Sequence, residues 1–419
     1  MTSDLTIAQL EDDPHPHLAR LRAEEPVAFV PALGGWLVTS RDLALAVMRD
    51  SAAFTVDDPR FSTAQVVGPS MLSLDGPVHA RHRDAFSRPF RPARTRERFT
   101  AFVEAEVGRL VGGLAPAGAA ELRGDLAGPL AVAVVTEALG LHGVDAATVR
   151  SWYGAFVEAV SAITAGGTAP GHAGEAYRLL RAAVEEAIAA SRPGSLLAEA
   201  ARGDLTTPEV VANAAILMFG GIDTTEGMIA NAALHLLENP GQLRLVLDDP
   251  DLLPAAIEES LRLEPSASVV DRYATRDTDL GGTTVGAGDL VRVSIAGANR
   301  DPAVFADPDR FDVRRHNTAE HLAFAHGPHF CFGAPLARLE ARTALAALLD
   351  RLPGCASTRP VPRGPAAWCS GDRPGWTSAG TPDGRLRTVP GVPSGRAVMG
   401  PSPNDRGTPG RAALRGGEP

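Results

Sequence analysis

The chain contains no lysine, so all 40 of its basic side chains are arginines, against 50 acidic residues and a formal net charge of −10. A nucleic-acid-binding protein needs a basic surplus to neutralise phosphates, and this balance argues against that class. Cysteine is also scarce, since Cys331, Cys355 and Cys369 are the whole set and include no Cys-x-x-Cys pair. Three such cysteines form no disulfide scaffold, and we expect reduced thiols.

Long hydrophobic runs are missing as well. The most apolar run, residues 126–135, has about half the length of a bilayer-spanning helix. The first residues lack both the basic region and the apolar core of a secretory signal. We therefore expect a soluble, cytoplasmic protein without a membrane partner. Its 419 residues are 44% hydrophobic, which suffices for a large core and excludes collagen-like and wholly disordered chains.

Charge and composition divide the chain near residue 353. Residues 354–419 carry nine arginines and four acidic residues, a net charge of +5, which leaves −15 for residues 1–353. The same segment holds 13 glycines and 11 prolines, and it cannot offset its chain entropy by burying apolar surface. We predict a single domain over 1–353 and a disordered or atypical tail over 354–419. A natural extension and a shifted reading frame both account for that tail.

Hydrophobic periodicity predicts a mainly α-helical domain with a small β portion. Helical patterns occupy residues 94–113, 122–140, 146–163, 171–192, 208–238, 252–264 and 332–350. Strand-like runs occupy residues 27–30, 36–39 and 279–294.

The predicted helix over 208–238 has an irregular centre. Gly220 and Gly221 each cost about 1 kcal/mol relative to alanine inside a helix, and Asp223 and Thr224 compete for its hydrogen bonds. Two glycines alone fit a close helix crossing equally well. An acid and an alcohol directly after them favour a widened groove that holds a small ligand and passes protons to it.

A second irregular segment delivers Cys331 to the start of the helix predicted over 332–350. A helix N-terminus lowers the pKa of a thiol, and Phe324 with its neighbouring phenylalanines would exclude water. One thiolate suits a single axial bond to haem iron better than a structural zinc site. An inert buried cysteine and a cysteine nucleophile with a histidine partner remain open alternatives.

A third segment places His79 and Arg83 four residues apart, on one helix face. Partly buried haem propionates need such paired cations. A solvated charged face is the ordinary interpretation of this pattern.

Five motifs together resemble the cytochrome P-450 superfamily, in its soluble bacterial form, over residues 8–350. The motifs, in family order, are Asp75-x-Pro77-x-His79-x-x-x-Arg83, Gly220-Gly221-x-Asp223-Thr224, Glu259-x-x-Arg262, the segment from Phe305 to Asp312, and Phe324-x-x-Gly327-x-His329-x-Cys331-x-Gly333.

The resemblance implies the cytochrome P-450 fold, with haem b between the long central helix and the helix that follows the cysteine loop. It implies a monooxygenase that hydroxylates or epoxidises a hydrophobic substrate and tailors a natural product such as a polyketide, terpene or peptide. A haem protein without turnover (a sensor, a carrier or a decayed enzyme) and an atypical oxidation such as desaturation or C–C coupling are the alternatives. Expected partners are dioxygen and a ferredoxin or flavodoxin with its NAD(P)H reductase, and we expect a monomer.

The resemblance also assigns roles to individual residues. Cys331 would be the thiolate ligand of the iron. Thr224 would hydrogen-bond dioxygen, and Asp223 would help deliver protons to it. The expected haem contacts are His79, Arg83, Arg272, His329, Phe324 and Gly333. The expected pocket residues are Leu217, Gly220, Val269 and Val270, with the loop 63–71 and the segment 152–177. The expected structural residues are Glu259, Arg262 and Arg310. The expected docking face for the redox partner is a cluster of arginines at positions 81, 83, 88, 91, 94, 96 and 98.

Two features depart from the family pattern. Ala325 stands where the family usually has glycine, which would be unfavourable if the position needs a positive φ. No segment of 354–419 has the pattern of the β hairpin that follows the last helix in the family, so one wall of the pocket would be absent or replaced.

Overall fold

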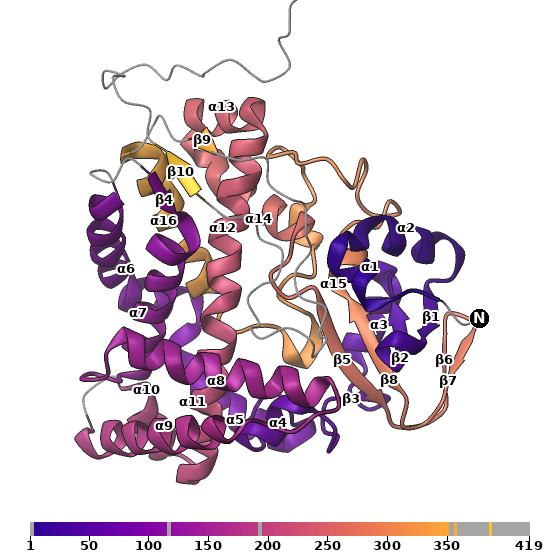
Figure 1. Cartoon of the computed structure of the whole chain (residues 1–419), viewed down its shortest axis with the longest axis horizontal. Coiled ribbons are helices and arrows are strands. Elements are labelled where there is room, and N and C mark those ends of the chain that lie inside the picture. Colours follow the sequence, from indigo (N-terminus) through magenta and orange to yellow (C-terminus); the bar gives the residue numbers. More distant parts are fainter. Residues whose placement is uncertain (1–3, 115–118, 192–194, 352–355, 358–384, 388–419) are drawn as a thin grey trace, which may run out of the picture.

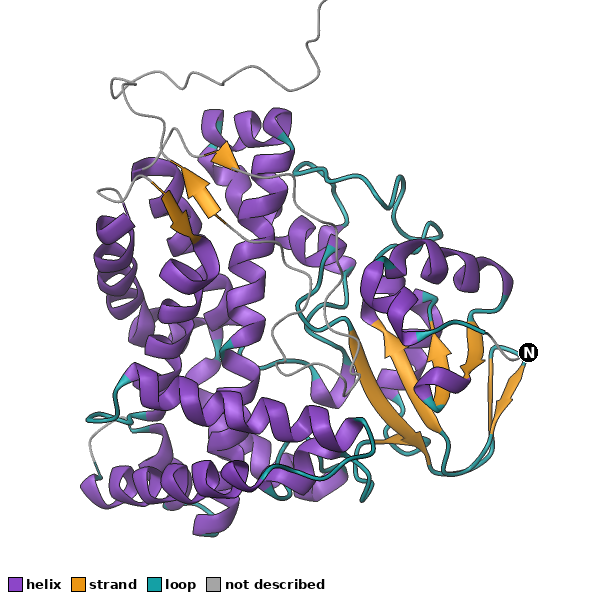
Figure 2. Ribbon diagram, viewed as in Figure 1, coloured by secondary structure: helices purple, strands orange, loops and turns teal. Residues whose placement is uncertain are grey.

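The computed structural model describes residues 4–114, 119–191, 195–351, 356–357 and 385–387. A large helical part lies beside a smaller part built on a twisted sheet and the N-terminal helices (Figure 1 and Figure 2). The helices are α1 (Ile7–Asp12), α2 (Pro14–Glu24), α3 (Arg41–Arg49), α4 (Ser62–Val67), α5 (Gly76–Ser87), α6 (Pro92–Leu114), α7 (Gly128–Leu139), α8 (Ala146–Thr164), α9 (Gly171–Ala190), α10 (Leu196–Ala201), α11 (Thr207–Gly221), α12 (Asp223–Glu238), α13 (Pro240–Asp248), α14 (Leu253–Leu263), α15 (Ile295–Ala298) and α16 (Ala334–Arg351).

The strands form three sheets, one of which positions part of the site. The strands are β1 (Val27–Val30), β2 (Gly35–Val38), β3 (Phe54–Thr55), β4 (Ala119–Glu121), β5 (Val269–Ala274), β6 (Thr278–Leu280), β7 (Thr283–Val285), β8 (Leu290–Ser294), β9 (Ala356–Ser357) and β10 (Arg385–Arg387). The largest sheet has the order β1-β2-β8-β5-β3. Strand β5 pairs antiparallel with β8, so that Arg272 lies opposite Val291, while β2 and β8 run parallel.

The predicted long helix is two helices. α11 and α12 meet at Ile222, whose φ of −88° and ψ of −78° interrupt the helical path. Thr206 closes the N-terminus of α11, and its side chain forms a capping box with Glu209. The break follows Gly220 and Gly221, where the sequence predicts weakened helix.

Several elements of the N-terminal part and the sheet were not predicted from the pattern. α2 begins with Pro14 and contains Pro16 in its first turn, so its start resembles a turn. Strand β5 carries Asp271 and Arg272 in its middle, and charged residues there obscure the alternation of a half-buried strand.

The third sheet bears on the predicted tail. Arg385–Arg387 pairs with both β4 and β9, and Ala356–Ser357 forms β9 itself. Two short strands therefore lie within the segment 354–419, for which the sequence predicts a disordered or atypical tail. The remainder of the predicted tail lies outside the described residues, and the single domain over 1–353 stays a prediction.

The main core lies where the long helices pack together. Phe86, Phe99 and Phe156 are fully buried in it, among aliphatic residues of α6, α7, α11, α12 and α16. Among the described residues, none of the helices is both long and apolar enough to cross a bilayer. α12 and α16 thus enter the site from a rigid, well-packed framework.

Candidate active site

A cavity of about 660 Å³ lies between the junction of α11 and α12, the start of α16 and strand β5. All four residues predicted to form the substrate pocket line it, and so do parts of the loop 63–71 and of the segment 152–177. The predicted site residues on its wall are Arg83, Leu217, Gly220, Asp223, Thr224, Val269, Val270, Arg272, Phe324, His329, Cys331 and Gly333. Segments that are 250 residues apart in the sequence therefore face one space.

The two glycines of the central helix have different roles. A Cβ on Gly221 would lie 2.6 Å from Val135 Cγ2 of α7, so this position permits a close helix crossing. A Cβ on Gly220 would meet nothing within 4 Å, and Gly220 lines the cavity. Gly221 therefore serves the close helix crossing, and Gly220 leaves open space on the cavity side.

The loop that carries Cys331 is held by its own backbone. The Cys331 N–H donates to the Phe324 carbonyl at 2.9 Å, and the Phe330 N–H donates to the Gly327 carbonyl at 3.0 Å. Gly327 has a φ of +71°, and a Cβ there would collide with the Met48 carbonyl. Ala325 has a φ of +56°, a conformation that favours glycine.

The Cys331 sulfur faces the cavity at the start of α16. Burial raises the pKa of the Cys331 thiol, and hydrogen bonds from the N–H groups of Gly333 and Ala334 oppose that rise, as does the charge of Arg83. The expected lowering by the helix N-terminus is therefore present but smaller than the effect of burial. A bound cation at the sulfur would reverse the balance, because a coordinated thiol is deprotonated.

Two arginines on the cavity wall are suited to an anion. Arg272 is 5% exposed, and its hydrogen bond among the described contacts goes to the neighbouring Asp271 carbonyl at 2.7 Å. The Arg83 guanidinium donates to the Phe330 carbonyl at 2.5 Å. Burial lowers the pKa of both guanidinium groups. One cation is buried and the other half-buried, and neither has an ion-pair partner among the described residues, so both are placed to receive a negative group.

The two predicted histidines lie against each other, with ring centroids 4.4 Å apart. His329 lines the cavity and bonds Asp75 Oδ1 through Nε2 at 2.9 Å. His79 lies behind it and does not belong to the cavity wall, although its buried Nε2 has no hydrogen-bond partner among the described residues. Burial, with the charges of His329 and Arg83, lowers the pKa of His79 to about 4.

These residues fit a haem, on which the resemblance depends. A single sulfur faces the cavity, and cationic and imidazole groups lie at its edge, where propionates need partners. Among the described residues, His79 Nε2 has no hydrogen-bond partner, and Arg272 donates to a backbone carbonyl without forming an ion pair. Gly220 and Gly333 both line the cavity, and a Cβ on Gly333 would make an ordinary contact with the Cys331 sulfur at 3.6 Å.

Asp223 and Thr224 form the opposite wall of the cavity. The Thr224 hydroxyl donates to the Gly220 carbonyl at 2.5 Å, within the interrupted turn. Burial raises the pKa of Asp223 to about 6, and a hydrogen bond from Tyr153 opposes this rise. Asp223 Oδ2 has no partner among the described residues. A carboxyl with this pKa can both hold and release a proton near neutral pH.

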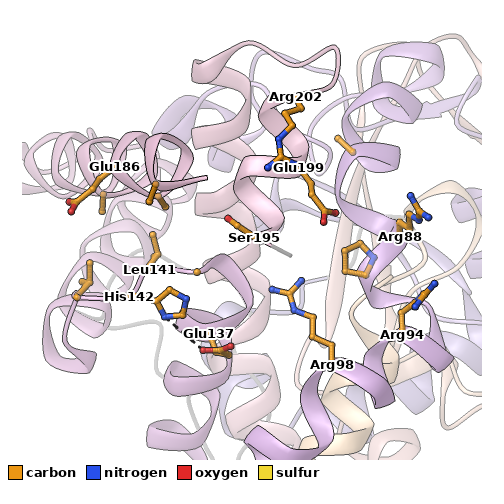
Figure 3. Close-up of a pocket in the computed structure, with 18 of the residues that line it drawn as sticks. Arg88, Arg94, Arg98, Glu137, Leu141, His142, Glu186, Ser195, Glu199 and Arg202 are labelled. Carbon is orange, nitrogen blue, oxygen red and sulfur yellow. Dashed lines mark ion pairs between the residues drawn. The ribbon is translucent and has the colours of Figure 1, made fainter. Parts of the chain in front are cut away.

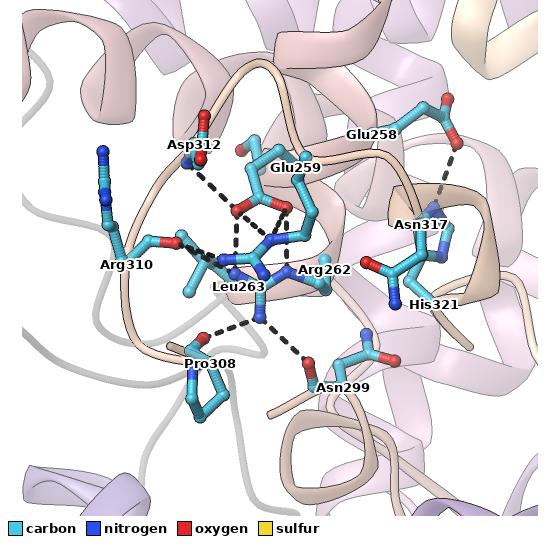
Figure 4. Close-up of polar contacts among 12 residues, drawn as sticks. Glu258, Glu259, Arg262, Leu263, Asn299, Pro308, Arg310, Asp312, Asn317 and His321 are labelled. Carbon is cyan, nitrogen blue, oxygen red and sulfur yellow. Dashed lines mark hydrogen bonds and ion pairs between the residues drawn. The ribbon is translucent and has the colours of Figure 1, made fainter. Parts of the chain in front are cut away.

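The predicted Glu-x-x-Arg pair is fully buried and ties α14 to the segment 305–315 (Figure 4). Arg262 forms two 2.8 Å bonds with Glu259 and also donates to the carbonyls of Asn299, Pro308 and Arg310. The side chain that completes the network is Arg315, which pairs with Glu259 at 3.0 Å. Arg310 contributes only its carbonyl, so its predicted side-chain role is corrected.

Sequence reasoning missed the roles of two buried groups on the cavity wall. Tyr153 of α8 lies in the segment expected to line the pocket, but nothing in the motif near Asp223 indicates its hydrogen bond to that carboxyl group. Glu340 of α16 is 3% exposed, its Oε2 has no partner among the described atoms, and burial raises its pKa well above the usual value. The sequence does contain an indication of Glu340, because it is an acidic residue on the apolar face of a predicted helix.

A second cavity, of about 960 Å³, lies away from Cys331 between α6 and the helices α7, α9 and α10 (Figure 3). Charged side chains of both signs line it. Arg98 extends between Glu137 and Glu199, donates to the Ala138 carbonyl at 3.2 Å and has a lowered pKa because it is partly buried. None of the predicted haem or pocket residues lines this cavity.

The fold and the site agree with comparisons to known proteins. The cytochrome P450 family model matches residues 247–353. The cytochrome P450 monooxygenase PikC of Streptomyces venezuelae is 40% identical over 82% of this chain and 85% of the relative. The nocardicin C N-oxygenase of Nocardia uniformis subsp. tsuyamanensis is 38% identical over 82% and 89%. The crystal structure of HmtN, a post-tailoring hydroxylase of himastatin biosynthesis, has a TM-score of 0.75 at 29% identity, over 92% and 100%.

The chain therefore belongs to the cytochrome P450 family. It is a mainly helical monooxygenase with a haem–thiolate cofactor, and the expected fold, activity and cofactor are confirmed. Its reaction uses an organic substrate, dioxygen and a redox partner.

Proposed function

We propose that this monooxygenase inserts one oxygen atom into a C–H or C=C bond of a hydrophobic natural product. The cavity carries the proposal, because it is large and lined mainly by apolar side chains such as Phe61, Met71, Leu72 and Ile163. The relatives add support, since HmtN is a tailoring hydroxylase of himastatin biosynthesis and another relative oxygenates nocardicin C. Apolar walls of this extent favour a large organic skeleton over a small polar metabolite.

In the proposed site Cys331 would be the thiolate ligand of the haem iron. Arg83, Arg272 and His329 would pair with the propionates, and His79 supports the His329 ring from behind. Phe324 and Gly333 lie on the cysteine side of the group. When bound, the haem supplies the electron-rich iron at which dioxygen is activated.

The residues on the cavity wall opposite Cys331 control protons. Thr224 presents its hydroxyl to the cavity beside Gly220, and the Asp223 carboxyl group can take up and release a proton near neutral pH. Release of that proton toward the Thr224 hydroxyl is the step that these two side chains perform. Because the apolar walls exclude bulk water, protons reach the cavity through Asp223 and Thr224 and not directly from bulk solvent.

The redox partner in this proposal is a ferredoxin or flavodoxin that docks near the cysteine loop. The enzyme in this proposal is a monomer. Phe330 and Val78 are 42% and 46% exposed near the cysteine loop, which is unusual for large apolar side chains. Arg88, Arg91 and Arg96 are exposed on the adjoining segment, whereas Arg81 pairs with Glu209 and Arg83 faces the cavity. An apolar centre with a basic rim suits an acidic electron carrier.

The proposal is tested by titrating the ferric holoenzyme with a library of hydrophobic natural products. A fitting ligand displaces water from the iron and shifts the Soret band. The same compounds are then incubated with NAD(P)H, reductase and ferredoxin, and product is identified by mass spectrometry. Binding without product in every case would overturn the proposal and favour a haem protein without turnover. Replacing Cys331 by serine serves as the matched control, since it removes the thiolate spectrum of the ferrous carbon-monoxide complex.

A further inference from the structure

Glu226 is a buried acid that none of the roles above uses. It lies one helical turn after Asp223 on α12 and is 5% exposed. Arg123 contacts its Oε1 atom twice, through Nε at 2.8 Å and Nη2 at 2.6 Å. Arg150 lies 3.7 Å from its Oε2 atom. The two guanidinium groups compensate the cost of burying this carboxylate, because an unpaired charge there would be strongly unfavourable.

The packing leaves space for this ion pair. Gly128 begins α7, and a Cβ there would lie 2.5 Å from Glu226 Oε2 and would also collide with the Arg150 guanidinium. Arg123 belongs to the π-helical segment Arg123–Ala127 that leads into α7. Such segments are rare and are frequent at functional sites. Glycine at 128 and the widened turn before it together admit both arginines to Glu226.

The charged cluster extends from the cavity to the surface. Asp223 lines the cavity, while the side chains of Arg123 and Arg150 are 15% and 47% exposed. Arg150 and Tyr153 are three residues apart on α8, so the helix that carries the outer arginine also carries the phenol that donates to Asp223. Across the cavity, α16 adds the carboxyl group of Glu340.

The charges that face Asp223 can be summed. Arg123 and Arg150 contribute +2 and Glu226 contributes −1, so an ionised Asp223 would make the cluster neutral. Without Glu226, Asp223 would face two uncompensated cations. The two arginines favour the ionised form of Asp223, whereas the negative charge of Glu226 and burial favour the protonated form.

We propose that Glu226, held by Arg123 and Arg150, is a positioning residue of the oxygenation reaction that keeps a proton on Asp223, whose carboxyl group Tyr153 orients. The inference rests on the proposed proton-delivering role of Asp223. Glu226 itself touches neither substrate nor cofactor. It acts through the field at Asp223, because its negative charge offsets one of the two nearby cations and so favours uptake of a proton by this carboxyl group near neutral pH.

The test measures the protonation of Asp223 directly. The carboxylic C=O band of Asp223 in the ferric holoenzyme is identified by infrared difference spectroscopy against Asp223→Asn and titrated with pH. Glu226→Gln moves the midpoint about one pH unit lower, because it leaves two cations beside Asp223. Arg150→Gln moves it higher, by less, because Arg150 is nearly half exposed. The two midpoints shift in opposite directions because the substitutions remove charges of opposite sign near Asp223, one from Glu226 and one from its partner Arg150.

Turnover supplies the second readout. With Glu226→Gln, the ratio of product to NAD(P)H consumed falls at neutral pH and recovers as the pH is lowered, since lower pH restores the proton on Asp223. Thiolate spectrum and haem content stay unchanged. Glu185→Gln, which breaks an exposed ion pair with Arg181 on α9, is the matched control and leaves both readouts unmoved.

An unmoved infrared midpoint in both Glu226→Gln and Arg150→Gln would overturn the inference. If Glu226→Gln fails to fold, Arg150→Gln decides alone, because its side chain reaches the surface. Failure of the parent proposal has a different signature: Asp223→Asn would keep full coupling while the infrared shifts still occur.

Discussion

The side-chain oxygen of Asn213 accepts the Met71 N–H at 2.9 Å and so ties α11 to the loop that borders the cavity. The other end of the same amide lies 2.9 Å from His82 Nδ1 on α5 and donates to the Glu209 carbonyl at 2.7 Å. Asn213 is fully buried. One side chain thus connects the helix of the expected redox face with the wall of the substrate pocket.

Asn213→Ala is expected to weaken substrate binding as well as the fold. The loss leaves the Met71 N–H unsatisfied in a buried position, which costs about 1–3 kcal/mol in the free energy of unfolding. The freed loop also raises the Kd for a fitting substrate, measured by the Soret shift. Asn231→Ala is the matched control, because Asn231 donates to the Glu264 carbonyl away from the loop. Equal effects of the two substitutions on Kd would contradict the positioning role.

Ala325→Gly is expected to stabilise the enzyme. Ala325 adopts a φ of +56°, where a side chain costs about 1–2 kcal/mol, and the greater freedom of glycine in the unfolded chain returns part of this. A net gain of about 0.5–1 kcal/mol follows, measured by urea unfolding of the holoenzyme. Ala323→Gly, in the same loop at a position without a positive φ, should bring no gain.

The network around Glu259 predicts a sharp contrast between two neighbouring arginines. Arg315→Ala removes a buried partner of Glu259 and should lower the free energy of unfolding by about 3 kcal/mol. Arg310→Ala keeps the carbonyl that Arg262 uses and should change it by less than about 0.5 kcal/mol. Thermal unfolding of both variants measures the difference, and a larger loss with Arg310→Ala would refute the assignment.

Asp223 makes stability depend on pH in a definite direction. Its pKa in the folded enzyme is about 6, above the usual 3.8, so the folded state binds this proton more tightly than the unfolded state. The contribution of Asp223 to the free energy of unfolding is fully present below about pH 4 and declines as the pH rises through 6. At pH 8 we expect Asp223→Asn to be more stable than the parent enzyme by about 1–3 kcal/mol, and the gain to vanish at pH 4. Asp248→Asn, on an exposed ion pair, should show no such pH-dependent gain.

The fold class and the centre of the site were predictable because their signals are local. The helical period, the two glycines before Asp223, and the spacing from Phe324 to Gly333 each depend on a few neighbouring residues. Ala325 belongs to this group, since the expected strain of a side chain at that position appears as a positive φ. The cavity brings these segments together in the way that the resemblance implies.

Contacts across elements were decided by the tertiary structure alone. The sequence indicates that Glu259 and Arg262 share a network, but only the path of the segment after Phe305 selects Arg315 over Arg310 as the third charge. The partner of Asp223 came from α8, which no motif connects with α12.

By itself, then, the sequence determined the family and predicted the thiolate ligand and the acid–alcohol pair, because each follows from residue type and spacing over one or two turns of chain. Only the tertiary structure decided that Tyr153 lies against Asp223, that His79 stands behind His329, and that Arg123 and Arg150 contact Glu226. The physical reason is that hydrogen bonds and ion pairs depend on distances of a few ångströms between elements, which are set by packing and not by position along the chain.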